Sequence, residues 1–356
     1  MTKNEILEQI EEEETIEACT VEGVDLYAAD LSGARFKNVL FLEVDFSTAK
    51  VAKTGFEACR FERCIFDRVD LGSSVWQKLH LKACRFHGAR LFKSLFVAVD
   101  FTDCDFTDAT LVGTSFSKSI LDGTRFAEVE CRKTSFSMCR MKNARFENNT
   151  LLSTTFFKTE MAGTKFVNTH LNKSVLMKCD LQEQDFSGMN LNRVQFNNSN
   201  MRQSNFSDAD IVASNFIGCD LSGCNFSHTV ATHTIFTRAI LASANFTGAQ
   251  LYQSNFQEAA ITGCNFSDAV MEQSYFASAA IQDTDFQSAD AKYVNFNYAV
   301  FENVCFADAN LSHASMHSAR LKKSGLEGAN TFALKKTDPD LFEAEHFSYH
   351  DHSVGE

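Results

Sequence analysis

Proline and tryptophan are nearly missing from this chain of 356 residues, because each occurs only once. Turns that depend on proline therefore contribute little to the fold. No run of 18 apolar residues occurs, so we expect no transmembrane helix and predict no contact with a membrane. Residues 1–19 are acidic and lack an apolar stretch, so we expect no signal peptide there. We predict a cytoplasmic protein, and export by a route that needs no signal peptide stays open.

Signatures of catalysis and of metal binding are missing as well. The sequence has no G-x-x-x-x-G-K-[ST] phosphate loop, no G-x-G-x-x-G, no H-E-x-x-H and no G-x-S-x-G. Its twelve cysteines include no C-x-x-C pair and show no zinc-ligand spacing, which favours free thiols in a reducing compartment. We predict that the chain is not an enzyme, and we expect no catalytic residue, cofactor, metal ion or small-molecule substrate.

A five-residue repeat dominates what the sequence does contain. A large apolar residue stands at almost every position whose number ends in 1 or 6, from Leu26 to Leu326, which makes 61 consecutive units in one frame. A second column, two residues earlier in each unit, carries small residues. This column holds nine of the twelve cysteines: Cys59, Cys64, Cys84, Cys104, Cys139, Cys179, Cys219, Cys224 and Cys264. We interpret these cysteines as small buried hydrophobes.

The period of five fits neither an α-helix nor a flat strand. It fits a square coil of four five-residue sides, in which the large and small residues point inward and successive coils stack. Stretches such as Ala209-Asp210-Ile211-Val212-Ala213 resemble the A-(D/N)-L-X-X unit of the pentapeptide-repeat family, over residues 26–330. The resemblance implies an all-β solenoid, a right-handed quadrilateral parallel β-helix of about 15 coils.

Phenylalanine is concentrated in the inward column. Thirty of the 35 phenylalanines lie there, and 26 of these occupy positions ending in 6. Ten residues are half a coil, so two opposite sides should carry ladders of stacked phenylalanine rings. The other two sides should carry aliphatic ladders.

Both ends of the chain depart from the repeat. Residues 3–18 predict a short amphipathic helix that caps the first coil. Thr337-Asp338-Pro339-Asp340 is typical of a helix start, and Leu341, Phe342 and Phe347 would cap the far end or join two rods into a dimer. A metal site at His346, His350 and His352 is an alternative to a flexible polar tail, which we favour. The predicted divisions are an acidic helical cap (1–20), the β-helix (21–330) and a C-terminal cap or tail (331–356).

Charge is uneven along and around the predicted rod. Of the net charge of −13, residues 1–20 carry −6 and residues 331–356 carry −4, so the body is nearly neutral. Within the body, residues 203–291 hold nine acidic residues and one basic residue, Arg238. We assign the acidic residues Glu43, Asp103, Asp108, Glu128, Glu183 and Asp208 to one corner of the coil. We assign the cations to the opposite corner: Lys53, Lys78, Lys93, Lys118, Lys133, Lys158, Lys173, Lys178 and Arg193.

Several apolar residues occupy positions that should face water. Phe92, Val112 and Leu152 fall in one outward column, and Val97, Phe157 and Met177 fall in a column on the adjoining side. Apolar patches on a protein surface often mark an interface. We therefore predict a protein-binding patch made of these six residues, with a protein partner of unknown identity.

Two functions from different classes follow. The first is a non-enzymatic, rod-like protein-binding scaffold of a bacterial cell, such as an accessory or delivered protein of a secretion system. The alternative is a DNA mimic that binds DNA gyrase or topoisomerase, as the resemblance to the quinolone-resistance members of the family implies. That alternative needs a dense acidic face, for which the 203–291 stretch is the candidate. Nucleic-acid binding by the cationic corner is a third reading, and the outward aromatic residues that such sites interleave with the bases are few near that corner.

Overall fold

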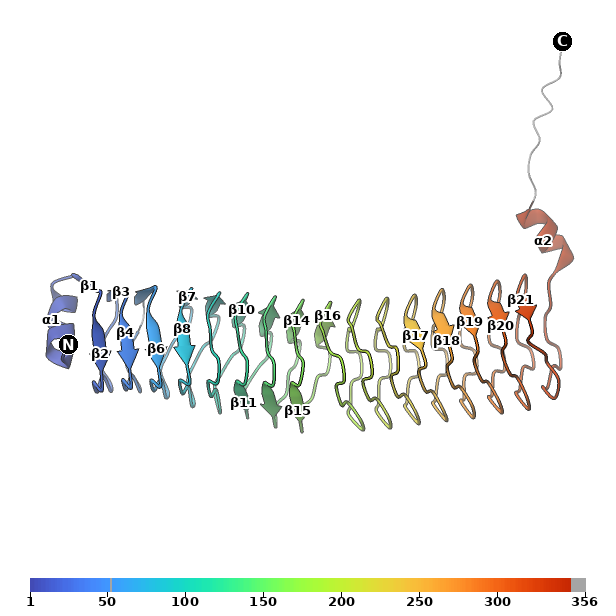
Figure 1. Ribbon diagram of the computed structural model, residues 1–356, viewed down its shortest axis with the longest axis horizontal. Helices are drawn as coiled ribbons and strands as arrows, with labels where there is room; N and C mark the ends of the chain where they lie inside the picture. The colour runs from blue at the N-terminus through green and yellow to red at the C-terminus, as the bar shows by residue number, and fades with distance from the viewer. Residues whose placement is uncertain (52, 347–356) are drawn as a thin grey trace, which may run out of the picture.

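The computed structural model describes residues 1–51 and 53–346, which form a long rod of stacked coils (Figure 1). Each coil takes 20 residues, because every strand pairs in parallel with a strand 20 residues away, as Phe116 does with Phe136. The rod contains about 15 coils, which confirms the predicted β-solenoid. None of the helices in the described ranges is long and apolar enough to cross a membrane.

Two short helices flank the solenoid, α1 (Lys3–Glu11) and α2 (Pro339–Glu345). Between them, the three-residue strands of the described residues line up in five parallel sheets, each on one side of the coil. One sheet contains β1 (Thr15–Glu17), β3 (Arg35–Lys37) and β5 (Gly55–Glu57). A second contains β2 (Thr20–Glu22), β4 (Leu40–Leu42), β6 (Arg60–Glu62) and β8 (His80–Lys82).

The remaining sheets lie further along the rod. One contains β7 (Val75–Gln77), β9 (Leu95–Val97), β10 (Ser115–Ser117), β12 (Ser135–Ser137), β14 (Thr155–Phe157) and β16 (Val175–Met177). Another contains β11 (Arg125–Ala127), β13 (Arg145–Glu147) and β15 (Lys165–Val167). The last contains β17 (Ile240–Ala242), β18 (Ala260–Thr262), β19 (Ala280–Gln282), β20 (Val300–Glu302) and β21 (Arg320–Lys322).

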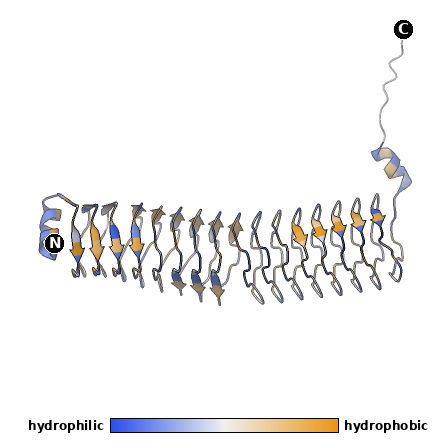
Figure 2. Cartoon of the chain, in the orientation of Figure 1, coloured by the Kyte–Doolittle hydropathy of each residue, from blue (hydrophilic) through white to orange (hydrophobic). Residues whose placement is uncertain are grey.

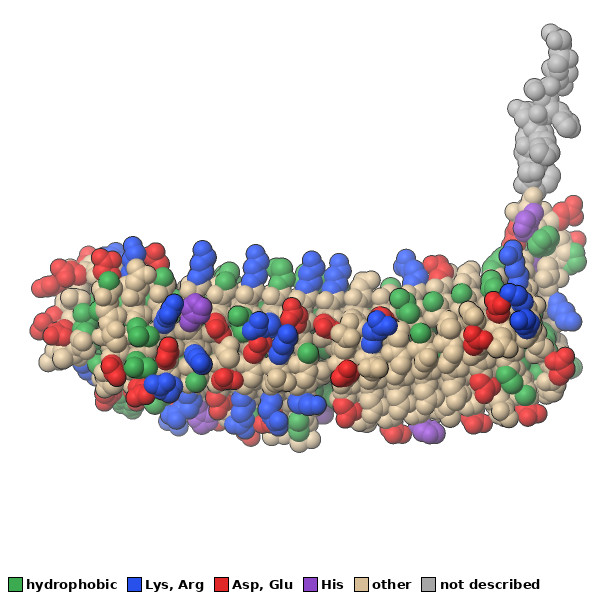
Figure 3. All heavy atoms as spheres, viewed as in Figure 1, with side chains coloured by type: hydrophobic (Ala, Val, Ile, Leu, Met, Phe, Trp, Pro, Cys, Tyr) green, Lys and Arg blue, Asp and Glu red, His purple; other side chains and the backbone are tan. Residues whose placement is uncertain are grey.

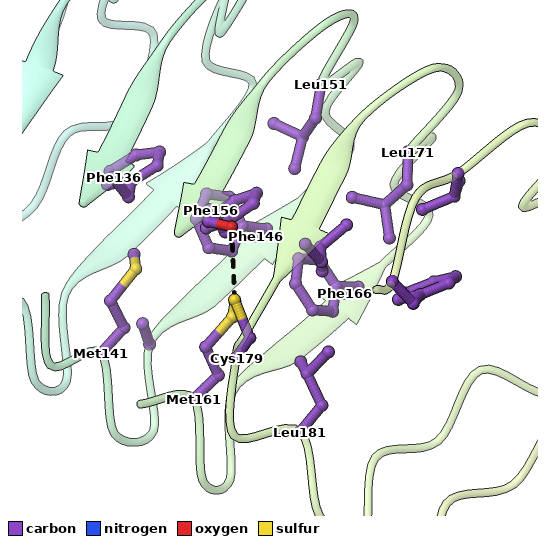
Figure 4. Close-up of a cluster of buried hydrophobic side chains, with 14 of the residues drawn as sticks. Phe136, Met141, Phe146, Leu151, Phe156, Met161, Phe166, Leu171, Cys179 and Leu181 are labelled. Carbon is purple, nitrogen blue, oxygen red and sulfur yellow. Dashed lines mark hydrogen bonds between the residues drawn. The ribbon is translucent and has the colours of Figure 1, made fainter. Parts of the chain in front are cut away.

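The core is formed by the inward side chains, which stack in columns along the whole rod. Figure 4 shows its four columns, with Phe136 and Phe156 on one side and Phe146 and Phe166 on the opposite one. The rings of Phe136 and Phe156 stack with centroids 5.0 Å apart and planes 9° apart. The columns between them hold aliphatic residues such as Met141 and Leu151. The two phenylalanine ladders are therefore where the sequence predicts them.

The small inward column forms a second line of contacts between coils. Its hydroxyl groups donate to carbonyl oxygens 23 residues earlier, as Thr164 Oγ1 does to the Met141 oxygen at 2.7 Å. Cysteine takes the same place: Cys179 Sγ lies 3.3 Å from the Phe156 oxygen (Figure 4). Burial raises the pKa of the Cys59 thiol to about 11 and that of Cys179 to about 12. These thiols are therefore free and protonated at neutral pH, as a structural role requires.

The ends agree only in part with the sequence analysis. Helix α1 begins with a capping box at Thr2 and buries Ile6 against the first coil, as predicted. It ends at Glu11 rather than near residue 18, because Glu13 has a positive φ of 57° and Ile16 already pairs with Phe36 in the solenoid.

Helix α2 forms where the sequence predicts it, but it projects sideways from the rod and leaves the last coil uncovered (Figure 1). Leu321 and Phe332 on that coil are 41 % and 69 % exposed, and Leu341 and Phe342 of α2 are exposed as well. Glu345 links α2 to the rod through His317, at 3.2 Å, and through Tyr298. The dimer through a terminal cap stays a prediction, and Phe347, His350 and His352 lie outside the described residues.

Candidate binding surface

One side of the N-terminal half of the rod differs from the others in charge. We call it the lysine-flanked side: the outward residues of β7, β9, β10, β12, β14 and β16 together with the corner residues on both edges. Each corner turns through a residue with positive φ, such as Lys93 at 54° and Lys118 at 54°. Side chains at these corners project away from the body. Figure 3 shows cationic side chains projecting at intervals along this edge of the rod.

The cations predicted for one corner occupy two corners, one on each edge of this side. The reason is that Lys93 and Lys118 differ by 25 residues, which is one coil plus one side. One edge carries Lys93, Lys133, Lys173 and Arg193, and the other carries Lys78, Lys118, Lys158 and Lys178; all eight are exposed. Lys53 precedes them by two coils. The acidic residues assigned to a single corner likewise divide between the two corners of the opposite side.

None of the eight cations takes part in an ion pair within residues 1–51 and 53–346. Several arginines on the other sides behave differently, because they reach a carboxylate one coil away. Arg85 contacts Asp67 at 2.7 Å, Arg90 contacts Asp70 at 2.7 Å and Arg140 contacts Asp122 at 2.7 Å. No carboxylate in the described residues therefore neutralises the positive charge of the lysine-flanked side.

The six residues of the predicted patch lie on this side and on the adjoining one, but not in one contiguous cluster. Phe157 and Met177 are direct neighbours in β14 and β16. Phe92 and Val112 occupy successive coils, and Phe92 and Leu152 are 45 % and 36 % exposed. Val97 stands three coils from Phe157 in the same column. Lys93 Nζ lies 4.8 Å from the Phe92 ring centroid, and Lys158 Nζ lies 5.6 Å from that of Phe157.

The sequence analysis missed three further apolar residues of this side. Val75 and Leu95 open β7 and β9 and are 55 % and 36 % exposed, and Met138 at a corner is 44 % exposed. These residues occupy positions whose numbers end in 5 and 8, whereas the predicted patch was drawn from positions ending in 2 and 7. Sorting the outward residues by the 20-residue coil would have placed all three beside the lysines.

A second apolar strip lies on the sheet of β17–β21, because β17 to β20 begin with Ile240, Ala260, Ala280 and Val300. The orange of these strands in Figure 2 also includes their buried middle residues. Ile240 and Val300, the first residues of β17 and β20, are 48 % and 47 % exposed. No cluster of three or more metal-ligating side chains was found in the described part of the chain. A shallow hollow over the first coils is lined by residues including Arg35, Phe56 and Glu57.

The acidic stretch 203–291 does not form one face. Its carboxylates fall on all four sides of the coil, as the positions of Asp210, Asp220, Asp285 and Glu258 illustrate. A surface that imitates the phosphates of a duplex needs charge concentrated along one line of the rod.

The geometry defines the class of protein before any comparison: a four-sided parallel β-helix built from five-residue units. A family model described as a pentapeptide repeat region matches residues 151–226. A second, described as pentapeptide repeats (8 copies), matches residues 84–123, 219–257, 254–290 and 294–330. Together they cover more than half of the chain, which belongs to the pentapeptide-repeat proteins. No curated protein is significantly similar to it in sequence.

Solved structures with this fold come from several sources. HetL, a pentapeptide-repeat protein involved in heterocyst differentiation in the cyanobacterium Nostoc sp. strain PCC 7120, is 18 % identical, with a TM-score of 0.17. That alignment covers 93 % of this chain and 97 % of HetL. A pentapeptide-repeat protein from the thylakoid lumen of Arabidopsis thaliana is 34 % identical over 25 % of this chain and 66 % of its own, with a TM-score of 0.17.

QnrB1, a plasmid-mediated fluoroquinolone resistance protein, is also similar in fold. Its full-length structure is 13 % identical, with a TM-score of 0.15, over 94 % of this chain and 100 % of QnrB1. Identity and superposition at this level carry no argument about function.

Proposed function

We propose that this chain is a non-enzymatic scaffold that binds another protein in a bacterial cytoplasm, as an accessory or delivered protein of a secretion system. The observation that carries the proposal is the apolar side chains at outward positions of a rigid surface. Phe157 and Met177 adjoin across β14 and β16, and Phe92 and Leu152 are exposed on the adjoining side. Aromatic residues and methionine are enriched at protein interfaces.

The rod supports such a role because its surface is built on one continuous core. The outward residues of the patch alternate with inward residues that are fully buried, such as Phe156 beside Phe157 and Leu176 beside Met177. Their backbones are held in a parallel ladder of six strands. A partner would therefore meet a preorganised surface, and binding would cost little ordering of the scaffold.

A capture experiment with a matched control tests the proposal. The purified chain and its Phe157→Asp variant are used to capture proteins from a bacterial lysate at low and moderate salt, with mass spectrometry of the bound fraction. We expect a specific partner that the variant fails to retain, because a buried unpaired carboxylate costs several kcal/mol, on the order of 2–5. Thr237→Asp, in the same outward column four coils away, should retain it.

Two outcomes would count against this function. A partner captured equally well by wild type and by Phe157→Asp would remove the patch as its site. Capture of gyrase or topoisomerase subunits that is lost as salt rises would favour the DNA-mimic alternative, which otherwise stays a prediction.

A further inference from the structure

We propose that the lysine-flanked side docks on the surface of an anionic phospholipid bilayer, with the rod lying parallel to the membrane plane. The proposal goes beyond the protein-binding function and concerns peripheral attachment. The proposal departs from the prediction of no contact with a membrane, because the lack of a long apolar run excludes only a helix that crosses one. Four features of the rod favour a bilayer: unpaired positive charge, exposed apolar groups, lysine rather than arginine, and negative charge on the far side.

The first feature is positive charge that no neighbouring carboxylate of the described residues neutralises. Between Ser73 and Asn198, the outward and corner positions of this side hold eight cations and no Asp or Glu, in a chain whose net charge is −13. None of the eight has an ion-pair partner within the described ranges, as shown above. Along each edge the lysines mostly recur every 40 residues, which is two coils, or about 10 Å. This spacing matches about one Debye length, so mutual repulsion is small while the outward field persists.

The second feature is the apolar groups that lie on the same side as the lysines. Val75, Leu95 and Met138 are exposed on this side, and Val97, Phe157 and Met177 are partly exposed beside them. Surfaces that lie in a membrane interface combine apolar side chains, which enter the headgroup region, with cations that attract anionic lipids. Lysine suits the edges because its stem can lie along apolar surface while its ammonium group stays in water.

The third feature is the preference for lysine: seven of the eight cations are lysine, and only Arg193 is arginine. Protein interfaces are enriched in arginine and depleted in lysine, because the guanidinium group binds carboxylates through two parallel hydrogen bonds. Arginines on other sides of the chain make such internal pairs, as Arg85 does with Asp67. A bilayer presents mobile headgroups, so the positive charge of a side chain matters more there than the forked geometry of a guanidinium group. Nucleic acid is disfavoured because Phe157 is the only outward aromatic between the two edges, where stacking would need several.

The fourth feature is the negative charge of the opposite side, which would orient the rod on a membrane. The opposite side of the C-terminal half carries seven carboxylates between residues 183 and 308 and no Lys or Arg. These carboxylates are Glu183, Asp185, Asp208, Asp268, Asp283, Asp285 and Asp308. An anionic surface attracts the lysine-flanked side and repels the opposite side. The attraction and the repulsion therefore favour the same orientation, with the lysine-flanked side against the membrane. The cations from Lys78 to Arg193 span nearly six coils, or about 28 Å of membrane contact.

Vesicle co-sedimentation of the full chain tests the proposal. We expect binding to vesicles of phosphatidylcholine with phosphatidylserine, none to phosphatidylcholine alone, and release as salt rises. Each lysine near an anionic surface contributes about fivefold to affinity. The variant with Lys78, Lys118, Lys133 and Lys158 all changed to Gln should therefore bind roughly 600-fold more weakly. Its control changes Lys82, Lys142, Lys165 and Lys322 to Gln on other sides, which gives the same net charge and should change affinity less than about threefold.

A fluorescence measurement reports whether the same side enters the interface. Leu95→Trp should shift to the blue and be quenched by brominated lipid on vesicle binding, whereas Ile240→Trp on another side should not. The native Trp76 is buried, at 2 % exposure, and gives a constant background.

Four results would overturn the proposal. They are no binding to anionic vesicles, equal binding to neutral vesicles, equal loss of affinity in the two four-lysine variants, and tighter binding of a DNA duplex than of vesicles through the same four lysines. Thermal unfolding of both variants separates these results from misfolding. If vesicles are not bound while Phe157→Asp still abolishes protein capture, the bilayer proposal fails and the scaffold function stands.

Discussion

Two stretches of the same side of the rod share one core and differ in their outer surface. In residues 75–177, the strand stretch, this side forms six paired strands. In residues 195–297, the turn stretch, it forms only isolated bridges such as Gln195–Asn215 and Asn255–Tyr275. The inward phenylalanines stack equally well in both: Phe116 and Phe136 at 5.0 Å, and Phe196 and Phe216 at 4.9 Å. The core therefore does not decide whether a side is a strand.

The residue just before the inward one accounts for the difference. In the turn stretch, Asn215 Oδ1 accepts a hydrogen bond from the Ile217 N–H at 2.8 Å, and Asn255 and Asn295 do the same two residues on. Asparagine and aspartate side chains commonly make such turns with their own backbone. No strand in residues 1–51 and 53–346 begins with Asn or Asp. Ile235 and Tyr275 also form isolated bridges and not strands, and the coils on either side of them carry Asn at the same position.

The largest effect should come from the core that the two stretches share. Phe136→Ala in the strand stretch and Phe216→Ala in the turn stretch should each lower the free energy of unfolding by about 3–5 kcal/mol. Each ring is fully buried and stacks on a ring above and below. Thermal or denaturant unfolding measures the loss. A clearly smaller cost in one stretch would show that the outer surface, rather than the core alone, supports the rod.

Most of the fold was predictable from the sequence because its signal is repeated many times. The frame from Leu26 to Leu326 assigns the inward columns, and the structure buries nearly all of them. The ends lack that repetition. Helix α2 was placed by its Asp338-Pro339 start, but nothing in those residues says whether Leu341 and Phe342 face the last coil.

The surface was harder to predict than the core for a different reason. A five-residue frame tells inward from outward, whereas neighbours on the surface are fixed by the 20-residue coil. Lys93 and Lys118 therefore looked like one corner, although a whole side separates them. Leu95 and Val75 were assigned to no surface at all until the strands β7 and β9 placed them beside the lysines. The exposures of Phe92 and Leu152 are facts of the fold, and their binding role stays a prediction.

A smaller effect should come from the local turns of the second stretch. Asn255→Ala removes the acceptor for the Gln257 N–H, so the variant should lose about 0.5–1.5 kcal/mol of stability. Ser135→Ala, at the matching position of the strand stretch, should change stability by less than about 0.5 kcal/mol. Denaturant unfolding at one protein concentration compares the two. An equal loss in both variants would mean that the turn hydrogen bond does not distinguish the stretches.

The smallest effect on stability should come from exchanging the local signals. Thr155 opens β14, and its side chain is only partly buried. In Thr155→Asn the new amide oxygen should accept from the Phe157 N–H, as Asn215 does from Ile217. We expect a stability change within about 0.5 kcal/mol and a turn in place of the strand in a crystal structure of the variant. Thr155→Ser serves as the control that keeps β14 paired with β12 and β16. If the substituted side chain points to solvent and β14 persists, the ladder of neighbouring strands outweighs the residue before the phenylalanine. The paired coils, rather than each five-residue unit, would then select strand or turn.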